Sequence, residues 1–173
     1  MKKVVLTFGL LSGLLSTLMM LANMSFIDSI GFDRGVVVGY IAIVISFLFV
    51  YFGIRSYRDN VLGGQITFGK AFTAGLLITL ISSAIYVGTW LVEYYTIFPD
   101  FGDKYAASLV ENVRAKGGSQ AEVDDMIKRG EEAKAMLANP LTNAAVSFTE
   151  PFPVGLLITL ISAAVLRTKA VQP

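Results

Sequence analysis

Glu150 has the strongest case for chemistry in this sequence, because it is an acid beside two prolines in an otherwise apolar stretch. It lies in the segment Phe148–Pro153, whose order is Phe-Thr-Glu-Pro-Phe-Pro. Pro151 and Pro153 remove backbone donors and break or bend a helix. Broken backbone at membrane depth is tolerated only where protein or water satisfies it. Glu150 is therefore either a structural cap at a helix break or a site for a proton, an ion or a ligand.

The distance to the next charge limits how deep Glu150 lies in a membrane. From Glu150 to Arg167 there are 17 residues, which is about 25 Å along a helix. If Arg167 marks one surface, Glu150 lies near the opposite edge of a hydrocarbon core about 30 Å thick. We expect a shallow carboxyl rather than a central one.

The other ionisable residues of the apolar part offer little chemistry. The chain has no histidine and no cysteine, so thiol catalysis, disulfides and histidine metal sites are excluded. Carboxylates gathered at one membrane face could bind a metal through oxygen, but nothing in their spacing fixes such a geometry. We therefore expect no catalytic residue, no metal site and no cofactor, and an enzyme is the least favoured class. The acids outside the polar insert are Asp28, Asp33, Asp59, Glu93 and Glu150.

An eight-residue repeat links two of the apolar blocks. Residues 75–82 recur letter for letter as residues 155–162, and the match extends upstream to align Lys70 with Glu150. If the two blocks run antiparallel, the repeat is inverted, and Lys70 and Glu150 fall on opposite membrane faces. Inverted repeats occur in transporters, but two similar helices that pack together also produce one. Small residues recur on one face of each copy and favour close helix packing in lipid: Gly75, Thr79, Ser82, Gly155, Thr159 and Ser162.

Two arginines, Arg55 and Arg58, follow the second apolar block and precede Gly63-Gly64. At a membrane surface they could hold anionic lipid head groups, or they could serve only to set the topology. The glycine pair lacks the pattern of a phosphate-binding loop. No basic patch exceeds a few residues, so we expect no nucleic-acid partner.

Four uncharged or nearly uncharged blocks must position these residues. The chain is 54% hydrophobic and 16% charged, and about 20 apolar residues cross a bilayer as a helix. The sequence predicts an all-α, four-helix transmembrane bundle, with spans at about 4–27, 35–54, 71–92 and 142–166, as one membrane domain over 1–173. The first block is longer than the apolar region of a signal peptide and lacks a good cleavage site, so we expect a retained anchor.

The distribution of basic residues predicts the orientation. The first loop carries only Arg34, whereas seven basic residues lie in the two terminal segments and the second loop. The positive-inside rule then places both termini in the cytoplasm. Trp90, Tyr94 and Tyr95 cluster near the outer boundary and predict an interfacial aromatic belt. The seven basic residues are Lys2, Lys3, Arg55, Arg58, Lys70, Arg167 and Lys169.

A polar insert at about 99–140 separates the third and fourth spans. Its apolar residues recur at helical spacing in two stripes, which Gly117-Gly118 separates. Ser119 and Glu122 have the spacing of a capping box. We expect an extracytoplasmic helical hairpin, which is either a solvated connector or a lid or docking element. The stripes comprise Tyr105, Leu109 and Val113, then Val123, Met126, Ile127, Met136 and Leu137.

Three stretches of this chain resemble an uncharacterised bacterial membrane-protein family, the domain of unknown function 4199. They are Tyr57–Asp59 leading into Gly63-Gly64, the span entry Phe68–Phe72, and Glu150–Gly155. The resemblance covers nearly the whole chain. It implies four helices in a bacterial inner membrane and brings no established activity, cofactor or catalytic residue.

Two functions remain open from the sequence. The first is a structural or accessory protein of the lipid bilayer, which associates with itself or with a membrane-protein partner. The alternative is a small oligomeric transporter or channel that uses Glu150 at its proline-broken helix. Recovery of a stoichiometric partner would favour the first function. Ion or proton flux that depends on Glu150 would favour the second.

Overall fold

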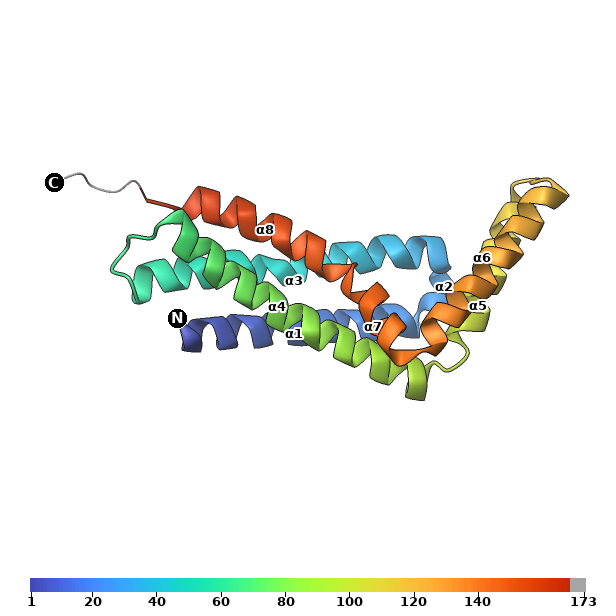
Figure 1. Ribbon diagram of the computed structural model, residues 1–173, viewed down its shortest axis with the longest axis horizontal. Coiled ribbons are helices and arrows are strands. Elements are labelled where there is room, and N and C mark those ends of the chain that lie inside the picture. The colour runs from blue at the N-terminus through green and yellow to red at the C-terminus, as the bar shows by residue number, and fades with distance from the viewer. Residues whose placement is uncertain (169–173) are drawn as a thin grey trace. The chain divides into compact units, whose positions relative to one another are not determined.

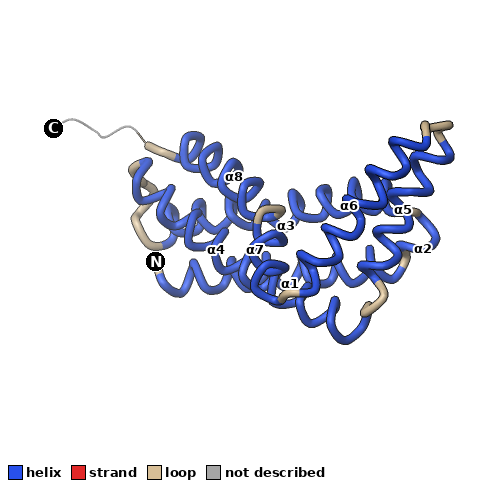
Figure 2. Tube along the Cα trace, turned by 45° about the vertical axis from the view of Figure 1, so that its right-hand side comes forward, coloured by secondary structure: helices blue, strands red, loops and turns tan. Residues whose placement is uncertain are grey.

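The protein is built from helices. A computed structural model describes residues 1–168, so Lys169 lies outside the described residues. Of the described residues, 87% are helical, and none of them forms a strand (Figures 1 and 2). The predicted all-α class is confirmed.

Within residues 1–168, four helical stretches are long and apolar enough to cross a membrane, as the sequence predicted. The third continues from an α-helix into a π-helical turn, and the fourth is interrupted at Thr149 and Glu150. The stretches are α1 (Lys2–Ser25), α3 (Phe32–Asn60), α4 (Phe68–Val92) with η1 (Glu93–Ile97), and α7 (Pro140–Phe148) with α8 (Pro151–Leu166). The shorter or more polar helices are α2 (Ile27–Ile30), α5 (Phe101–Ala115) and α6 (Gln120–Ala138).

The second helix is longer than its predicted span. We predicted 35–54, but α3 continues to Asn60, so Arg55 and Arg58 lie on its last turns and not in a loop. A helix satisfies its own backbone hydrogen bonds, so it can extend past the apolar block into the head-group region. The end of the uncharged block therefore does not mark the end of the helix.

By internal contacts the chain forms two compact units. We call residues 1–87 with 148–168 the bundle unit and residues 88–147 the insert unit. The insert unit thus includes the last turns of the third span and most of α7, and it is larger than the predicted insert at 99–140.

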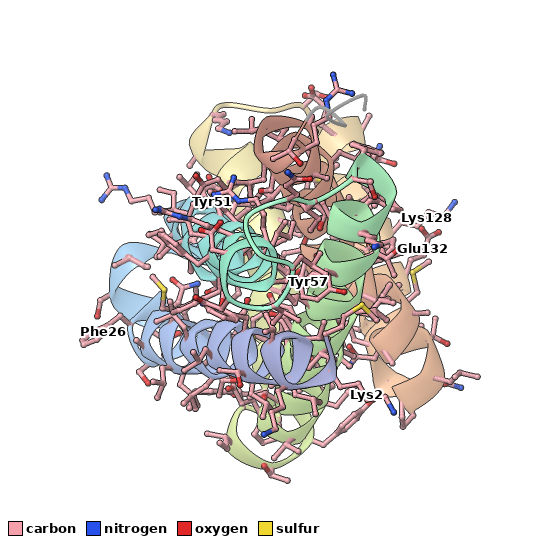
Figure 3. All side chains as sticks on the ribbon, turned by 90° about the vertical axis from the view of Figure 1, so that its left-hand side faces the viewer. Lys2, Phe26, Tyr51, Tyr57, Lys128 and Glu132 are labelled. Carbon is pink, nitrogen blue, oxygen red and sulfur yellow. The ribbon has the colours of Figure 1, made fainter. Side chains whose placement is uncertain are left out.

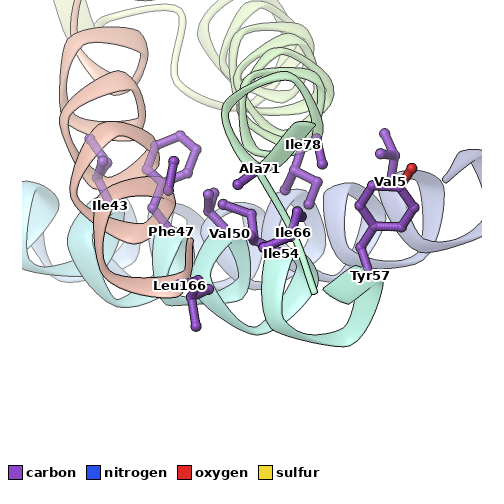
Figure 4. Close-up of a cluster of buried hydrophobic side chains, with 12 residues drawn as sticks. Val5, Ile43, Phe47, Val50, Ile54, Tyr57, Ile66, Ala71, Ile78 and Leu166 are labelled. Atoms are coloured by element: carbon purple, nitrogen blue, oxygen red, sulfur yellow. The ribbon is translucent and has the colours of Figure 1, made fainter. Parts of the chain in front are cut away.

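Helices α1, α3, α4 and α8 pack side by side in the bundle unit (Figure 1). Lipid chains are as apolar as these side chains, so close packing rather than escape from water holds such helices together. Val5, Tyr57, Ile66 and Leu166 belong to one buried cluster (Figure 4). The start of α1, the end of α3, the start of α4 and the end of α8 therefore lie at one end, where Figure 3 shows Lys2 and Tyr57.

In the insert unit, α5 and α6 pack against each other. A Cβ added at Gly130 would lie 2.9 Å from Ala106 Cβ, and Lys134 Nζ lies 2.8 Å from Asp103 Oδ1. The capping box at the start of α6 is confirmed: the Glu122 backbone N–H donates to Ser119 Oγ (3.4 Å), and Ser119 N–H donates to Glu122 Oε2 (2.7 Å).

The predicted apolar stripe of α6 is buried only in part. Val123 is 4% exposed, whereas Ile127 and Met136 are 47% and 50% exposed. At 100° per residue, Ile127 and Met136 lie on opposite sides of α6, because nine residues separate them. Grouping Met136 with Val123 in one stripe was therefore wrong, since a single contact face cannot cover both.

Candidate functional site

The two copies of the sequence repeat pack directly against each other. A Cβ added at Gly75 would lie 2.8 Å from Thr159 Cγ2, and one added at Gly155 would lie 2.5 Å from Thr79 Cγ2. The hydroxyls of Thr79 and Thr159 lie 3.0 Å apart, and Thr79 Oγ1 donates to the Gly155 carbonyl (3.3 Å). Each glycine thus leaves room for the threonine side chain of the other copy.

This reciprocal contact requires α4 and α8 to run antiparallel. Residue 75 meets residue 159 and residue 79 meets residue 155, so the numbers rise in opposite directions. The aromatic residues upstream repeat too: Phe68 stacks on Phe72 with ring centroids 6.1 Å apart, and Phe148 stacks on Phe152 at 4.9 Å. Gly75, Thr79, Gly155 and Thr159 of the repeat therefore pack α4 against α8 within the same chain.

A serine cluster joins three helices of the bundle unit. Ser12 Oγ on α1 donates to the Ser46 carbonyl on α3 (2.8 Å) and lies 2.8 Å from Ser82 Oγ on α4. All three residues are buried. Two other buried polar atoms in this unit, Asn23 Oδ1 and Ser83 Oγ, have no hydrogen-bond partner. Ser12 therefore links α1 to both α3 and α4.

Glu150 lies at the interruption between α7 and α8, on the outside of the bundle unit. Its Oε2 accepts a hydrogen bond from Tyr86 Oη on α4 (3.0 Å). Pro151 is buried at the first position of α8, and Pro153 is exposed in the same turn. A carboxylate held by a tyrosine hydroxyl at a helix break can bind a proton or a cation.

Lys70 lies far from Glu150, although the repeat aligns the two residues. Lys70 is exposed in the first turn of α4. Tyr86, which contacts Glu150, is 16 residues further along the same helix, or about 24 Å. The structure does not bring Lys70 and Glu150 together.

Arg55 and Arg58 share one carboxylate at the end of α3. Arg58 Nε lies 2.6 Å from Asp59 Oδ1, and Arg55 Nε lies 3.6 Å from Asp59 Oδ2. Arg58 Nη1 also donates to the carbonyl of Leu166 at 3.5 Å, near the end of α8. Arg58 thus ties α3 to α8, whereas Arg55, with 55% of its side chain exposed, stays accessible.

An aromatic cluster forms the core of one end of the insert unit. The Trp90 ring lies edge-on to Phe101 at 4.9 Å and 5.6 Å from Tyr94. Trp90 and Tyr94 are 9% and 8% exposed, and Tyr95 is 40% exposed. The interfacial aromatic belt was predicted to anchor these side chains in lipid, which is wrong for Trp90 and Tyr94, because Phe101 of α5 packs against both rings.

Asn143 on α7 fixes this cluster through three hydrogen bonds. Its Oδ1 accepts from Trp90 Nε1 (2.9 Å) and from Ser147 Oγ (3.1 Å), and its Nδ2 donates to the Leu137 carbonyl (3.0 Å). Tyr95 Oη donates to the same carbonyl (2.8 Å). Asn143 is 0% exposed, so the buried amide is satisfied.

Glu93 is a functional candidate that its sequence context alone did not distinguish from the other acids. It is the first residue of η1 and is 1% exposed, and neither carboxylate oxygen has a hydrogen-bond partner. π-helical turns are rare and frequent at functional sites. The signal in the sequence was an acid that directly precedes two tyrosines and follows Trp90 by three residues, near the end of an apolar helix.

The surface of the insert unit carries paired charges of both signs. Asp103 and Glu131 raise the pKa of Lys134 through hydrogen bonds and charge, and hydrogen bonds from Ser119 lower the pKa of Glu122. Exposed pairs of this kind contribute little to stability. Within residues 1–168, no group of three or more acidic, histidine or cysteine residues could hold a metal ion.

Comparison with known families covers both units. The family model described as "Protein of unknown function (DUF4199)" matches residues 7–168. The chain belongs to this family. The resemblance seen in the sequence is thereby confirmed. No curated protein and no solved structure matches the chain.

Proposed function

We propose that this DUF4199 protein is a structural or accessory subunit of the bacterial inner membrane, which associates with itself or with a partner complex. The observation that carries the proposal is the internal use of small and polar residues. Gly75 and Gly155 seat Thr159 and Thr79, and Ser12 bonds across to α3 and α4. Such contacts favour one fixed packing of the bundle.

The charge at one end of the bundle unit supports an orientation with both termini in the cytoplasm. The starts of α1 and α4 and the ends of α3 and α8 meet there, and six basic residues lie on these segments. Asp59 is the acid that accompanies them. The positive-inside rule favours this end in the cytoplasm, which leaves α5 and α6 as an extracytoplasmic helical hairpin. The six are Lys2, Lys3, Arg55, Arg58, Lys70 and Arg167.

The lipid bilayer is the first partner, and its anionic head groups suit this basic end. Arg55 and Lys70 are exposed there. Each basic side chain near an anionic surface contributes about 1 kcal/mol of attraction. Arg58 contributes less, because it is held by Asp59 and by the end of α8.

Association with a protein partner must use other surfaces than the repeat. Gly75 and Gly155 are covered within the chain, so the remaining surfaces are the apolar outside of the spans and the charged insert unit. On α6, Lys128 and Arg129 are exposed, with 77% and 65% of their side chains accessible. The insert unit is the surface that a partner outside the membrane would reach.

The experiment is recovery of partners and oligomeric mass from native nanodiscs. The proposal expects a reproducible stoichiometric partner or a defined homo-oligomer. A variant with Lys128→Glu and Arg129→Glu should lower partner recovery or oligomer mass, whereas the control Gln65→Glu, at an exposed position outside the insert unit, should not. A monomer without partner would contradict the proposal.

The alternative function is a small oligomeric transporter or channel. The hydrogen bond from Tyr86 to Glu150 at the interruption between α7 and α8 is the observation that favours it. In liposomes, Glu150→Gln should then change proton or cation flux, while Asp59→Asn should not. Flux equal to that of empty liposomes for both variants and for the natural chain would remove this alternative.

A further inference from the structure

Glu93 is a buried acid for which the protein supplies no donor. The side chain is 1% exposed, and both carboxylate oxygens are without a hydrogen-bond partner. It opens the π-helical turn η1, which closes through the hydrogen bond from the Phe98 N–H to the Glu93 carbonyl (2.8 Å). A buried polar group is normally hydrogen-bonded, so this carboxyl requires a separate explanation.

Three side-chain donors at this end of the insert unit bond to groups other than Glu93. Trp90 Nε1 donates to Asn143, and Asn143 Nδ2 and Tyr95 Oη both donate to the Leu137 carbonyl. These bonds engage Trp90, Asn143 and Tyr95 without any contribution from Glu93.

Several charged groups of α5 and α6 pair with one another rather than with Glu93. Lys134 binds Asp103 (2.8 Å) and Glu131 (3.3 Å), and Lys104 binds Asp100 (3.1 Å). No charged residue lies on α7. The titratable groups on these elements are Tyr94 and Tyr95 on η1; Asp100 before α5 and Asp103, Lys104, Tyr105, Glu111 and Arg114 on it; and Glu122, Asp124, Asp125, Lys128, Arg129, Glu131, Glu132 and Lys134 on α6.

A carboxylate that is buried without a cation or a donor is unfavourable, and it becomes neutral by taking up a proton. We propose that Glu93 is a proton-binding site and that its carboxyl is protonated when the insert unit is closed. Release transfers the proton to water and leaves a carboxylate, which needs hydration. Ionisation is therefore coupled to opening of the η1 turn.

This coupling makes the insert unit responsive to the pH of its compartment, which goes beyond the accessory function proposed above. Folding of the closed unit favours the protonated form. The stabilisation of the closed insert unit by the protonated Glu93 carboxyl is therefore fully present in acid and is lost as the pH rises.

The test follows unfolding of the insert unit through Trp90, the single tryptophan of the chain. Thermal unfolding of the full-length protein in nanodiscs is recorded between pH 5 and 9. The Trp90 transition of the natural chain should shift to lower temperature as the pH rises. Glu93→Gln should remove most of this shift, while the exposed control Glu111→Gln should retain it.

A second neutral variant and a cation titration complete the test. Glu93→Leu keeps the site uncharged and fills it differently, so it serves if Glu93→Gln does not fold. In the natural chain, an infrared band of a protonated carboxyl that Glu93→Gln or Glu93→Leu removes would support the proposal. An identical pH dependence in the natural chain and both neutral variants would overturn it. Stabilisation by sodium ions at fixed pH, lost in the variants, would instead assign a metal cation.

Discussion

The contact between the repeats can be tested by one substitution at two places on the same helix. Gly75 and Gly88 both lie within α4. A Cβ at Gly75 would lie 2.8 Å from both Ile54 Cδ1 and Thr159 Cγ2, whereas a Cβ at Gly88 meets nothing within 4 Å. Alanine at either position therefore changes the backbone preference equally and differs only in what the new methyl group meets.

The expected magnitudes follow from two opposing terms. Gly→Ala in a helix interior stabilises by about 0.5–1 kcal/mol, and overpacking costs about 1–3 kcal/mol. Gly88→Ala should therefore leave the free energy of unfolding unchanged or raise it. The free energy of unfolding of Gly75→Ala should be about 1–3 kcal/mol lower than that of Gly88→Ala. Thr159→Ser removes the methyl group that clashes and keeps the hydroxyl, so it should recover part of the loss in Gly75→Ala.

The assay is equilibrium unfolding in mixed detergent micelles, followed by helicity. Equal unfolding free energies for Gly75→Ala and Gly88→Ala would refute the close contact of α4 with α8. A loss in Gly75→Ala that Thr159→Ser deepens rather than relieves would refute the role of the threonine methyl group.

Three further substitutions test other contacts. Ser12→Ala removes the links from α1 to α3 and α4 and should cost about 0.6–1.7 kcal/mol for each hydrogen bond lost, measured in the same unfolding assay. Asn143→Ala leaves the Trp90 N–H without its acceptor and should cost about 1–3 kcal/mol, with a red shift of the tryptophan fluorescence. Ser119→Ala should speed amide hydrogen exchange at the start of α6. Because Ser119 lowers the pKa of Glu122, the protection in the natural chain should be present near neutral pH and decline in acid.

Local patterns predicted most of the architecture. Uncharged runs predicted the four candidate spans, because a run of about 20 apolar residues is long enough to cross a bilayer as a helix. The capping box at Ser119 depends on two residues three positions apart, so it could also be predicted from the sequence. The helix ends were less visible, since α3 continues through Arg55 and Arg58 after its apolar run has ended.

The contacts that define the candidate sites come from distant segments. Trp90 is buried because Phe101 and Asn143 approach it, and Asn143 lies 53 residues away. Without that tertiary context, aromatic residues near a span end resemble lipid anchors. Glu93 was for the same reason counted only as one acid among several.

Accessibility of single cysteines tests most directly the proposal that the basic end is cytoplasmic and the insert unit extracytoplasmic. The chain has no native cysteine, so Gln65→Cys and Lys116→Cys, both at exposed positions, can each be labelled alone. A membrane-impermeant maleimide added to intact cells with a permeable outer membrane should label position 116 at once. It should label position 65 only after the inner membrane is opened. Immediate labelling at 65 with protection at 116 would contradict the account.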